Sequence, residues 1–360
     1  MLEIQNVSKT FNAGTVNEKT ALNGLNLKLN EGDFVTVIGG NGAGKSTMLN
    51  AVAGVWPVDC GKIIIDGVDV TRLSEHQRAA YIGRVFQDPM TGTAATMQIE
   101  ENLALAARRG KPRTLRIGIT RAEREQYREL LKSLDLGLEN RLTARVGLLS
   151  GGQRQALTLL MATMNKPKLL LLDEPLSNLD AKLRLSMRVE IKRLQKKLGI
   201  TTLFVTHDQE ECFSISDKVA VMNNGVIEQF DTPENIYRRP ATEFVARFIG
   251  FENFLEMERD GVHVYRVPDG SRFEVDMDCE EEAFAGTIRP DDICLAEQGQ
   301  QENVLTGAVG VRTFLGKSYQ YEVNTAAGVL KVNMDTSNLF REGQEIRLYL
   351  PKDKLVLVRR

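Results

Sequence analysis

A glycine-rich run, Gly39-Gly40-Asn41-Gly42-Ala43-Gly44-Lys45-Ser46, constrains the fold of this chain more than any other feature. It follows the continuous apolar segment Phe34–Ile38, which is typical of a buried central strand. Glycines let several backbone N–H groups surround one anion, because no Cβ blocks the approach of the ligand. A helix that begins near Lys45 would add the positive end of its dipole. The run therefore predicts a phosphate-binding loop between a strand and a helix.

The order of residues in this run fits the P-loop pattern, in which the lysine and the hydroxyl have separate roles. Lys45 would reach the β- and γ-phosphates of a nucleotide, and the Ser46 hydroxyl would coordinate Mg²⁺. A simple glycine-rich turn is the structural alternative, but a chance match is expected in only about 1% of chains of this length. The other expected nucleotide-binding residues of this segment are Gly39, Asn41, Gly42, Gly44 and Thr47.

Two consecutive carboxylates follow a second apolar run, Leu169–Leu172. Asp173 would hold the Mg²⁺ ion, and Glu174 would polarise the attacking water as a general base. A strand that merely ends in solvated acids is the alternative. The presence of a P-loop favours the catalytic interpretation, because a P-loop needs an acidic partner at the end of a neighbouring buried strand.

The spacing of apolar residues divides the chain into regions. Helical spacing over residues 88–166 predicts a mainly helical subdomain. Short apolar runs then alternate with helical segments up to about Arg239, which predicts a parallel sheet covered on both faces. Beyond Phe251, short alternating runs separated by Gly, Asp and Pro predict a small β-barrel or sandwich. We therefore expect domains at residues 1–239 and 240–360.

Composition excludes several classes of protein. The chain has 360 residues, a net charge of −2 and 26% charged residues, so no basic field indicates nucleic acid as a partner. No uncharged window reaches the roughly 18 residues of a membrane span. The first residues lack the basic and apolar regions of a signal peptide, so we expect a cytoplasmic protein.

A second glycine pair, Gly151-Gly152, stands between Ser150 and Gln153 at the predicted start of a helix. Ser150 is positioned to cap that helix, which alone would explain the serine but not the two glycines. Two glycines at a helix start make a second anion-binding turn. One nucleotide cannot fill both turns within one small domain, so we expect a second subunit to share it.

With these motifs the sequence resembles the ABC transporter ATPase family, in which the Leu149–Gln153 signature closes over ATP held by the P-loop of the facing subunit. The resemblance implies an α/β P-loop NTPase domain with an inserted helical subdomain. Ile288–Asp292 resembles the signature of the family's small all-β, oligonucleotide-fold-like regulatory domain (TOBE type). The implied function is ATP hydrolysis, with Mg²⁺, in a bacterial importer of a small solute. The implied partners are a second copy of the chain, membrane permease subunits and a solute-binding protein, with the ATPase peripheral on the inner face of the membrane.

The resemblance also assigns roles to single residues. Phe11 would stack on the adenine, although a buried core position is its structural alternative. Gln87 would sense Mg²⁺ and the attacking water, while joining the two subdomains. His207 would contact the γ-phosphate, where the alternative is a surface or core histidine. Asp180 would cross between subunits beside the nucleotide, where the alternative is a helix N-cap.

The two parts of the chain resemble two different branches of this family. Residues 1–172 are most similar to importer ATPases assigned to tryptophan-like amino acids, whereas the sequence from Glu174 onward resembles the branch for polyamines, ferric iron, phosphonates or maltose. This change predicts a hybrid chain joined near Asp173.

Two other functions are open from the residues. A different P-loop phosphotransferase, such as a kinase, would share the phosphate loop but would need an acceptor pocket in place of the Ser150 turn. An ABC-type ATPase detached from transport would more often carry coiled-coil arms, a second ATPase unit or a basic face.

Overall fold

The computed structural model describes residues 1–111, 118–276 and 284–360, which divide into two compact units. Unit 1 spans Met1–Pro233, and unit 2 spans Glu234–Arg360. The break between the units precedes residue 239, where the sequence analysis ends the first domain. That domain boundary stays a prediction.

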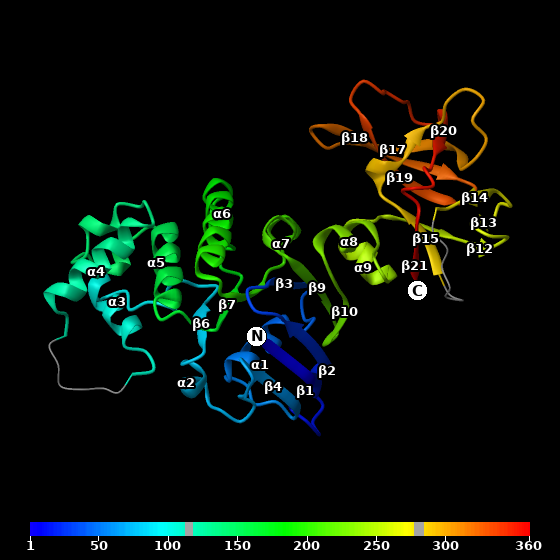
Figure 1. Ribbon diagram of the computed structural model, residues 1–360. Coiled ribbons are helices and arrows are strands. Elements are labelled where there is room, and N and C mark those ends of the chain that lie inside the picture. The colour runs from blue at the N-terminus through cyan, green and yellow to red at the C-terminus, as the bar shows by residue number, and fades with distance from the viewer. Residues whose placement is uncertain (112–117, 277–283) are drawn as a thin grey trace. The chain divides into compact units, whose positions relative to one another are not determined.

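A six-stranded sheet with the order β10-β9-β3-β8-β7-β6 forms the centre of unit 1 (Figure 1). Strand β3 is buried along its whole length, and all neighbouring pairs are parallel except β9 with β10. Because parallel strands bring their carboxyl ends to one edge, the loops that follow β3, β7 and β8 meet there. The strands are β3 (Phe34–Gly39), β6 (Ile82–Val85), β7 (Leu169–Asp173), β8 (Thr201–Val205), β9 (Lys218–Asn223) and β10 (Val226–Asp231).

Both faces of this sheet are covered, as the apolar runs predict. Alternate residues of one strand enter different cores: Leu171 packs in the core that contains helix α1, whereas Leu170 packs in the core that contains helix α6. A second, antiparallel sheet with the order β2-β1-β4-β5 lies in the α1 core. The elements are α1 (Lys45–Ala53), α6 (Ala181–Leu198), α7 (Gln209–Ile215), β1 (Leu2–Phe11), β2 (Lys19–Leu29), β4 (Cys60–Ile65) and β5 (Val68–Asp69).

The helical subdomain contains α3 (Ile99–Ala107), α4 (Arg121–Lys132) and α5 (Gly151–Thr163). Their apolar faces form a separate core with members such as Leu103 and Tyr127. The short helix α2 (Glu75–Arg78) precedes β6, and single 3₁₀ turns lie at Leu138–Asn140 and Val146–Leu148. The predicted helical subdomain is therefore confirmed for the part that the structure describes, while residues 112–117 lie outside it.

Unit 2 is mainly β structure, as expected, with two short helices at its start, α8 (Pro233–Arg238) and α9 (Glu243–Phe248). Its sheets have the orders β11-β15-β21, β12-β13-β14 and β16-β20-β17-β18-β19. The strands are β11 (Asn253–Glu256), β12 (Glu258–Arg259), β13 (Val264–Arg266), β14 (Arg272–Glu274), β15 (Phe284–Ile288), β16 (Cys294–Leu295), β17 (Val304–Phe314), β18 (Ser318–Thr325), β19 (Gly328–Asp335), β20 (Glu345–Tyr349) and β21 (Val356–Arg359).

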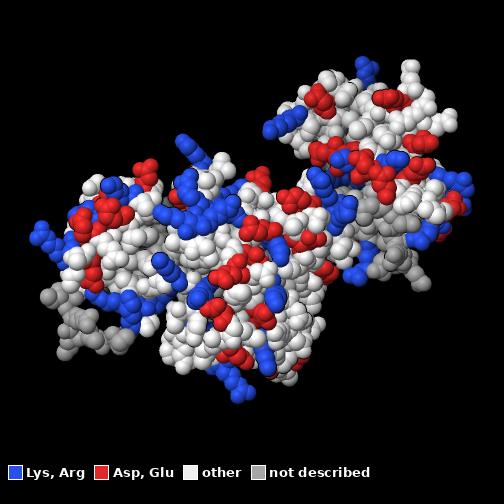
Figure 2. Space-filling model, in the orientation of Figure 1, with Lys and Arg blue, Asp and Glu red and all other residues white. Residues whose placement is uncertain are grey.

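The distribution of surface charge and the apolar character of the helices bear on which partners the chain can contact. On the face drawn in Figure 2, the Lys and Arg side chains of unit 1 are interspersed with Asp and Glu. Among the helices of residues 1–111, 118–276 and 284–360, none has the length and apolar character needed to cross a membrane.

Candidate active site

The glycine-rich loop begins where β3 ends at Gly39 and turns into α1 at Gly44. Gly44 has φ 104°, and a Cβ on it would lie 2.4 Å from the carbonyl oxygen of Ala21. A Cβ on Gly39 would lie 2.1 Å from the carbonyl oxygen of Met222. Both positions therefore require glycine because neighbouring backbone approaches too closely for a side chain.

Lys45 is the first residue of α1 and is only 7% exposed. Its Nζ donates hydrogen bonds to the carbonyl oxygens of Gly39 at 2.8 Å and Gly40 at 3.0 Å. Burial lowers the pKa of Lys45, and the nearby carboxylate of Glu174 opposes that shift. The loop thus holds an ammonium group beside its own backbone, where an anionic ligand would gain a charged donor.

A cleft of about 320 Å³ opens beside this loop. Phe11 forms part of its wall and lies edge-on to Trp56, with 5.6 Å between ring centroids. Phe11 is partly exposed and lies outside the buried core. The alternative interpretation, that Phe11 is a buried core residue, is therefore wrong. The lining residues are Phe11, Lys19, Ala21, Asn41, Gly42, Ala43, Gly44, Lys45, Ser46, Thr47 and Glu174.

Glu174 lies at the centre of a polar cluster with Gln87 and His207. The three residues belong to three separate sequence motifs. The Glu174 Oε2 accepts a hydrogen bond from Gln87 Nε2 at 3.3 Å and lies 3.1 Å from His207 Nδ1. The backbone of Glu174 has φ 41°, and its N–H donates to the Val205 carbonyl oxygen at 2.9 Å, which fixes the loop after β7 against β8. The structure therefore brings together a carboxylate base, an imidazole and an amide at the edge of the cleft that contains Lys45.

Asn178 is a member of this cluster that the sequence analysis missed. Its Nδ2 donates to the carbonyl oxygen of Gln87 at 3.1 Å and so ties together two loops. Asn178 lies in the same short loop as Asp180, but the sequence alone does not indicate its contact with Gln87.

Asp173 ends β7 with a side chain that is 18% exposed. Burial raises the pKa of Asp173, the guanidinium of Arg84 lowers it, and the charge of Glu174 raises it further. The Arg84 Nη2 atom lies 3.7 Å from Asp173 Oδ2, a contact that sequence motifs do not indicate.

The oxygen donors near the cleft fit a hard cation. Ser46 presents an exposed hydroxyl, Asp173 a carboxylate and Gln87 an amide oxygen, all of which suit Mg²⁺. In the described part of the chain, no three His, Cys, Asp or Glu side chains form a metal-binding group. A Mg²⁺ ion here would therefore depend on hydroxyl and phosphate oxygens as well as on a carboxylate, as Mg²⁺ sites at phosphates do.

Ser150 caps α5 as predicted: its Oγ accepts from the Gln153 N–H at 3.3 Å, and the Gln153 Oε1 accepts from the Ser150 N–H at 3.2 Å. A Cβ on Gly152 would lie 2.3 Å from Leu183 Cδ2, so close packing against α6 requires this glycine. A Cβ on Gly151 would meet only Leu179 Cδ2, at 4.0 Å, and Gly151 is exposed. One glycine of the pair thus also has a packing reason, and the role of both glycines in binding an anion stays a prediction. None of these residues lines the cleft beside Lys45.

Asp180 caps α6, with its Oδ1 accepting from the Leu183 N–H at 3.0 Å. Asp180 therefore acts as a helix N-cap, which is the structural role that the sequence analysis gave as the alternative. Its predicted contribution to a nucleotide stays a prediction.

Comparisons with known proteins agree with this geometry. The model of the family described as ABC transporter matches residues 22–177, and the model described as TOBE domain matches residues 286–358. The Fe(3+) ions import ATP-binding protein of Photorhabdus laumondii is 38% identical over 344 residues, which cover 94% of this chain and 91% of that protein. The chain belongs to the ABC transporter ATP-binding proteins.

Other relatives of this ABC protein are similar over most of their length. The spermidine/putrescine import ATP-binding protein of Clostridioides difficile is 37% identical over 90% of this chain and 88% of that protein. The solved dimeric structure of the cassette MJ0796 in a post-hydrolysis state with ADP and Pi has 30% identity and a TM-score of 0.56, covering 65% of this chain and 99% of that one. This ABC protein is accordingly an ATP-binding importer subunit that hydrolyses ATP to power import, as the sequence predicts.

Proposed function

We propose that two copies of this chain hold two ATP molecules between the Lys45 loop of one copy and the Ser150 turn of the other. The observation that carries this proposal is the Glu174 carboxylate, which lines the Lys45 cleft within 3.3 Å of Gln87 and 3.1 Å of His207. The exposed and capped Ser150 turn lies outside that cleft and is free to cover a nucleotide bound by another copy. The cassette MJ0796, which was solved as a dimer bound to ADP and Pi, supports a dimeric, nucleotide-bound form.

Each residue of the cleft has a chemical role in this arrangement. The backbone N–H groups of the glycine-rich loop and the Lys45 ammonium bind phosphate oxygens, and Phe11 offers a face to the adenine. Glu174 accepts a proton from the attacking water, and His207 contacts the γ-phosphate. Gln87 and Asp180 position the water and the facing subunit.

Mg²⁺ is the metal that the donor set supports. Ser46 and Asp173 would hold it, with Gln87 alongside. When bound, the ion neutralises charge on the phosphate oxygens.

A glutamine substitution tests the role of Glu174. Glu174→Gln removes the base but keeps the shape of the side chain, so ATP binding is expected to stay within about twofold while hydrolysis falls by roughly a hundredfold or more. Fluorescent-nucleotide titration and phosphate release measure the two quantities. Glu210→Gln, an exposed glutamate of α7 outside the cleft, serves as the control and should hydrolyse ATP normally. Unchanged turnover of Glu174→Gln would contradict the assignment.

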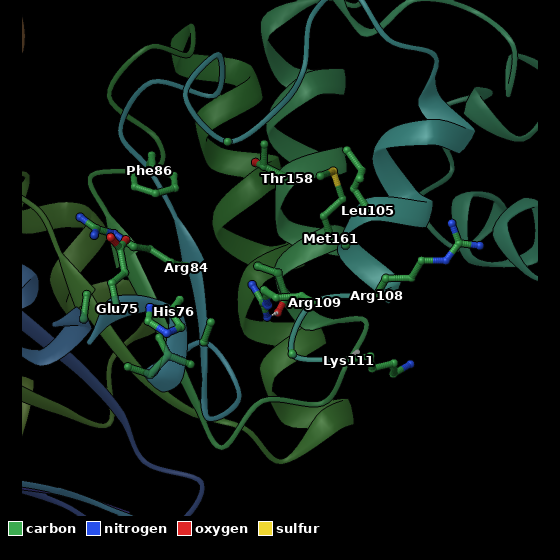
Figure 3. Close-up of a pocket in the computed structure, with 17 residues that line it drawn as sticks. Glu75, His76, Arg84, Phe86, Leu105, Arg108, Arg109, Lys111, Thr158 and Met161 are labelled. Carbon is green, nitrogen blue, oxygen red and sulfur yellow. Dashed lines mark hydrogen bonds between the residues drawn. The ribbon is translucent and has the colours of Figure 1, made fainter. Parts of the chain in front are cut away.

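We further propose that membrane permease subunits dock beside the Gln87 loop and the helical subdomain, with the ATPase peripheral on the inner face of the membrane and a solute-binding protein in the same system. A cleft of about 1140 Å³ lies in this region (Figure 3). Its lining combines apolar side chains with a set of cations: Ile82, Phe86, Leu105 and Met161 with Arg84, Arg108, Arg109 and Lys111. An apolar segment of a partner fits such a lining.

The hybrid interpretation belongs to the same proposal and is supported by the sequence motifs alone. Residues 1–172 include the Gln87 loop and the cleft, so partner choice should follow the amino-acid branch, whereas unit 2 should bring the regulation of the polyamine and iron branch. Co-purification with permeases of each type measures this choice. Pairing only with a polyamine or iron permease would contradict the proposal.

A further inference from the structure

Arg84, on strand β6, touches both the Asp173 carboxylate and the large cleft of Figure 3. Its Nη2 donates to Asn50 Oδ1 at 2.7 Å and lies 3.7 Å from Asp173 Oδ2. The guanidinium carbon lies 4.5 Å from the centroid of the Phe86 ring. Because three groups on different segments hold it, the charge of Arg84 occupies a defined place beside the end of β7.

Arg84 and Asp173 are both largely buried, which strengthens the electrostatic interaction between their side chains. The Arg84 side chain is 13% exposed and the Asp173 side chain 18% exposed. The Nε of Arg84 has no hydrogen-bond partner, so the protein does not use the whole guanidinium for structural bonds. Charges at such sites are screened less than charges on the surface.

We propose that Arg84 is a positioning residue that opposes metal binding at Asp173; this inference rests on the proposed role of Asp173 as a Mg²⁺ carboxylate. An arginine beside the carboxylate neutralises part of the charge that a divalent cation needs, and it repels that cation directly. The metal must therefore displace or tolerate a cation that is already in place. Removing the charge of Arg84 should make Mg²⁺ bind more tightly.

The contact also connects the metal carboxylate to the cleft surface. In Figure 3, the carboxylate of Glu75, from helix α2, lies beside the guanidinium of Arg84, and both residues line the cleft. Arg84 thus contacts Asp173 and also lines a cleft that is open to other molecules. A cleft occupant that draws Arg84 away from Asp173 acts in the same direction as removal of its charge.

The test measures how much Mg²⁺ strengthens the binding of a non-hydrolysable ATP analogue to the full chain. The affinity is determined once with Mg²⁺ and once with EDTA, and the ratio is the magnesium enhancement. Arg84→Met should raise this ratio about tenfold, from the repulsion of a unit charge and a divalent ion several ångströms apart. Binding in EDTA should change little, which a merely structural role of Arg84 would not produce.

Arg109→Met is the matched control. Arg109 lines the same cleft and is half-buried, and its Nη2 donates to the Ala162 carbonyl oxygen at 3.4 Å. Within the described part of the chain it forms no ion pair with a carboxylate, so its removal should leave the magnesium enhancement unchanged. If Arg84→Met does not fold, Arg84→Gln is measured in its place, because Gln keeps a donor toward Asn50 without the charge.

Asp173→Asn separates this inference from the proposed function. If Asp173→Asn leaves the magnesium enhancement at the wild-type value, the metal role of Asp173 is wrong, and the inference falls with it. If Asp173→Asn abolishes the enhancement while Arg84→Met leaves it unchanged or lowers it, only the role of Arg84 is overturned. Support requires that the gain from Arg84→Met disappears in the Asp173→Asn background.

Discussion

Single glycines decide whether the phosphate loop can form. Gly42 and Gly44 both have positive φ, at 81° and 104°. The two differ in their surroundings: a Cβ on Gly42 would meet only Lys19 Nζ at 3.6 Å, whereas a Cβ on Gly44 would lie 2.4 Å from backbone oxygen. Backbone strain is therefore common to both positions, and a steric clash is confined to one.

This difference predicts unequal effects of alanine. Gly42→Ala should lower the free energy of unfolding of unit 1 by about 1 kcal/mol, from the left-handed conformation alone. Gly44→Ala should lower it by about 3 kcal/mol, because rigid backbone must also move. Urea unfolding followed by the fluorescence of Trp56, the single tryptophan, reports on unit 1. Equal losses for the two variants would show that the clash at Gly44 is relieved at little cost.

At the residue scale, the sequence predicts site members only where a motif marks them. Lys45, Glu174 and His207 belong to recognisable local patterns, and the structure brings all three to one region. The roles of Arg84 and Asn178 are not marked in this way, since each acts through a contact with a distant segment. Contacts of this kind depend on tertiary packing, which local sequence does not determine.

At the scale of elements, apolar periodicity is sufficient to predict the central strand, the parallel sheet and the helical subdomain. The predictable features are those that burial on one or two faces imposes on sequence. Strand bounds are less determined: β1 continues to Phe11, although its last buried residue is Val7. Pairing with β2 extends it there, because Phe11 pairs with Lys19. The packing of Gly152 against α6 is likewise set by two helices together.

At the scale of the whole molecule, the chain carries two glycine-containing helix starts, at Lys45 and at Ser150, and the Ser150 turn does not line the Lys45 cleft. In the proposed dimer, the second copy of the chain supplies the nucleotide that the Ser150 turn would bind. Ser150→Asp isolates this function, because aspartate is as good an N-cap as serine and should keep α5 stable. Its carboxylate would face the phosphates of the nucleotide and repel them.

Sedimentation of the Glu174→Gln chain with Mg-ATP tests the shared nucleotide most directly. The chain has a mass of 40.2 kDa, and we expect twice that mass with Mg-ATP, a shift that is lost with ADP and abolished when Ser150→Asp is added. A Glu174→Gln chain that stays at its single mass in saturating Mg-ATP, or one that doubles its mass equally well with Ser150→Asp, would contradict the sandwiched nucleotide.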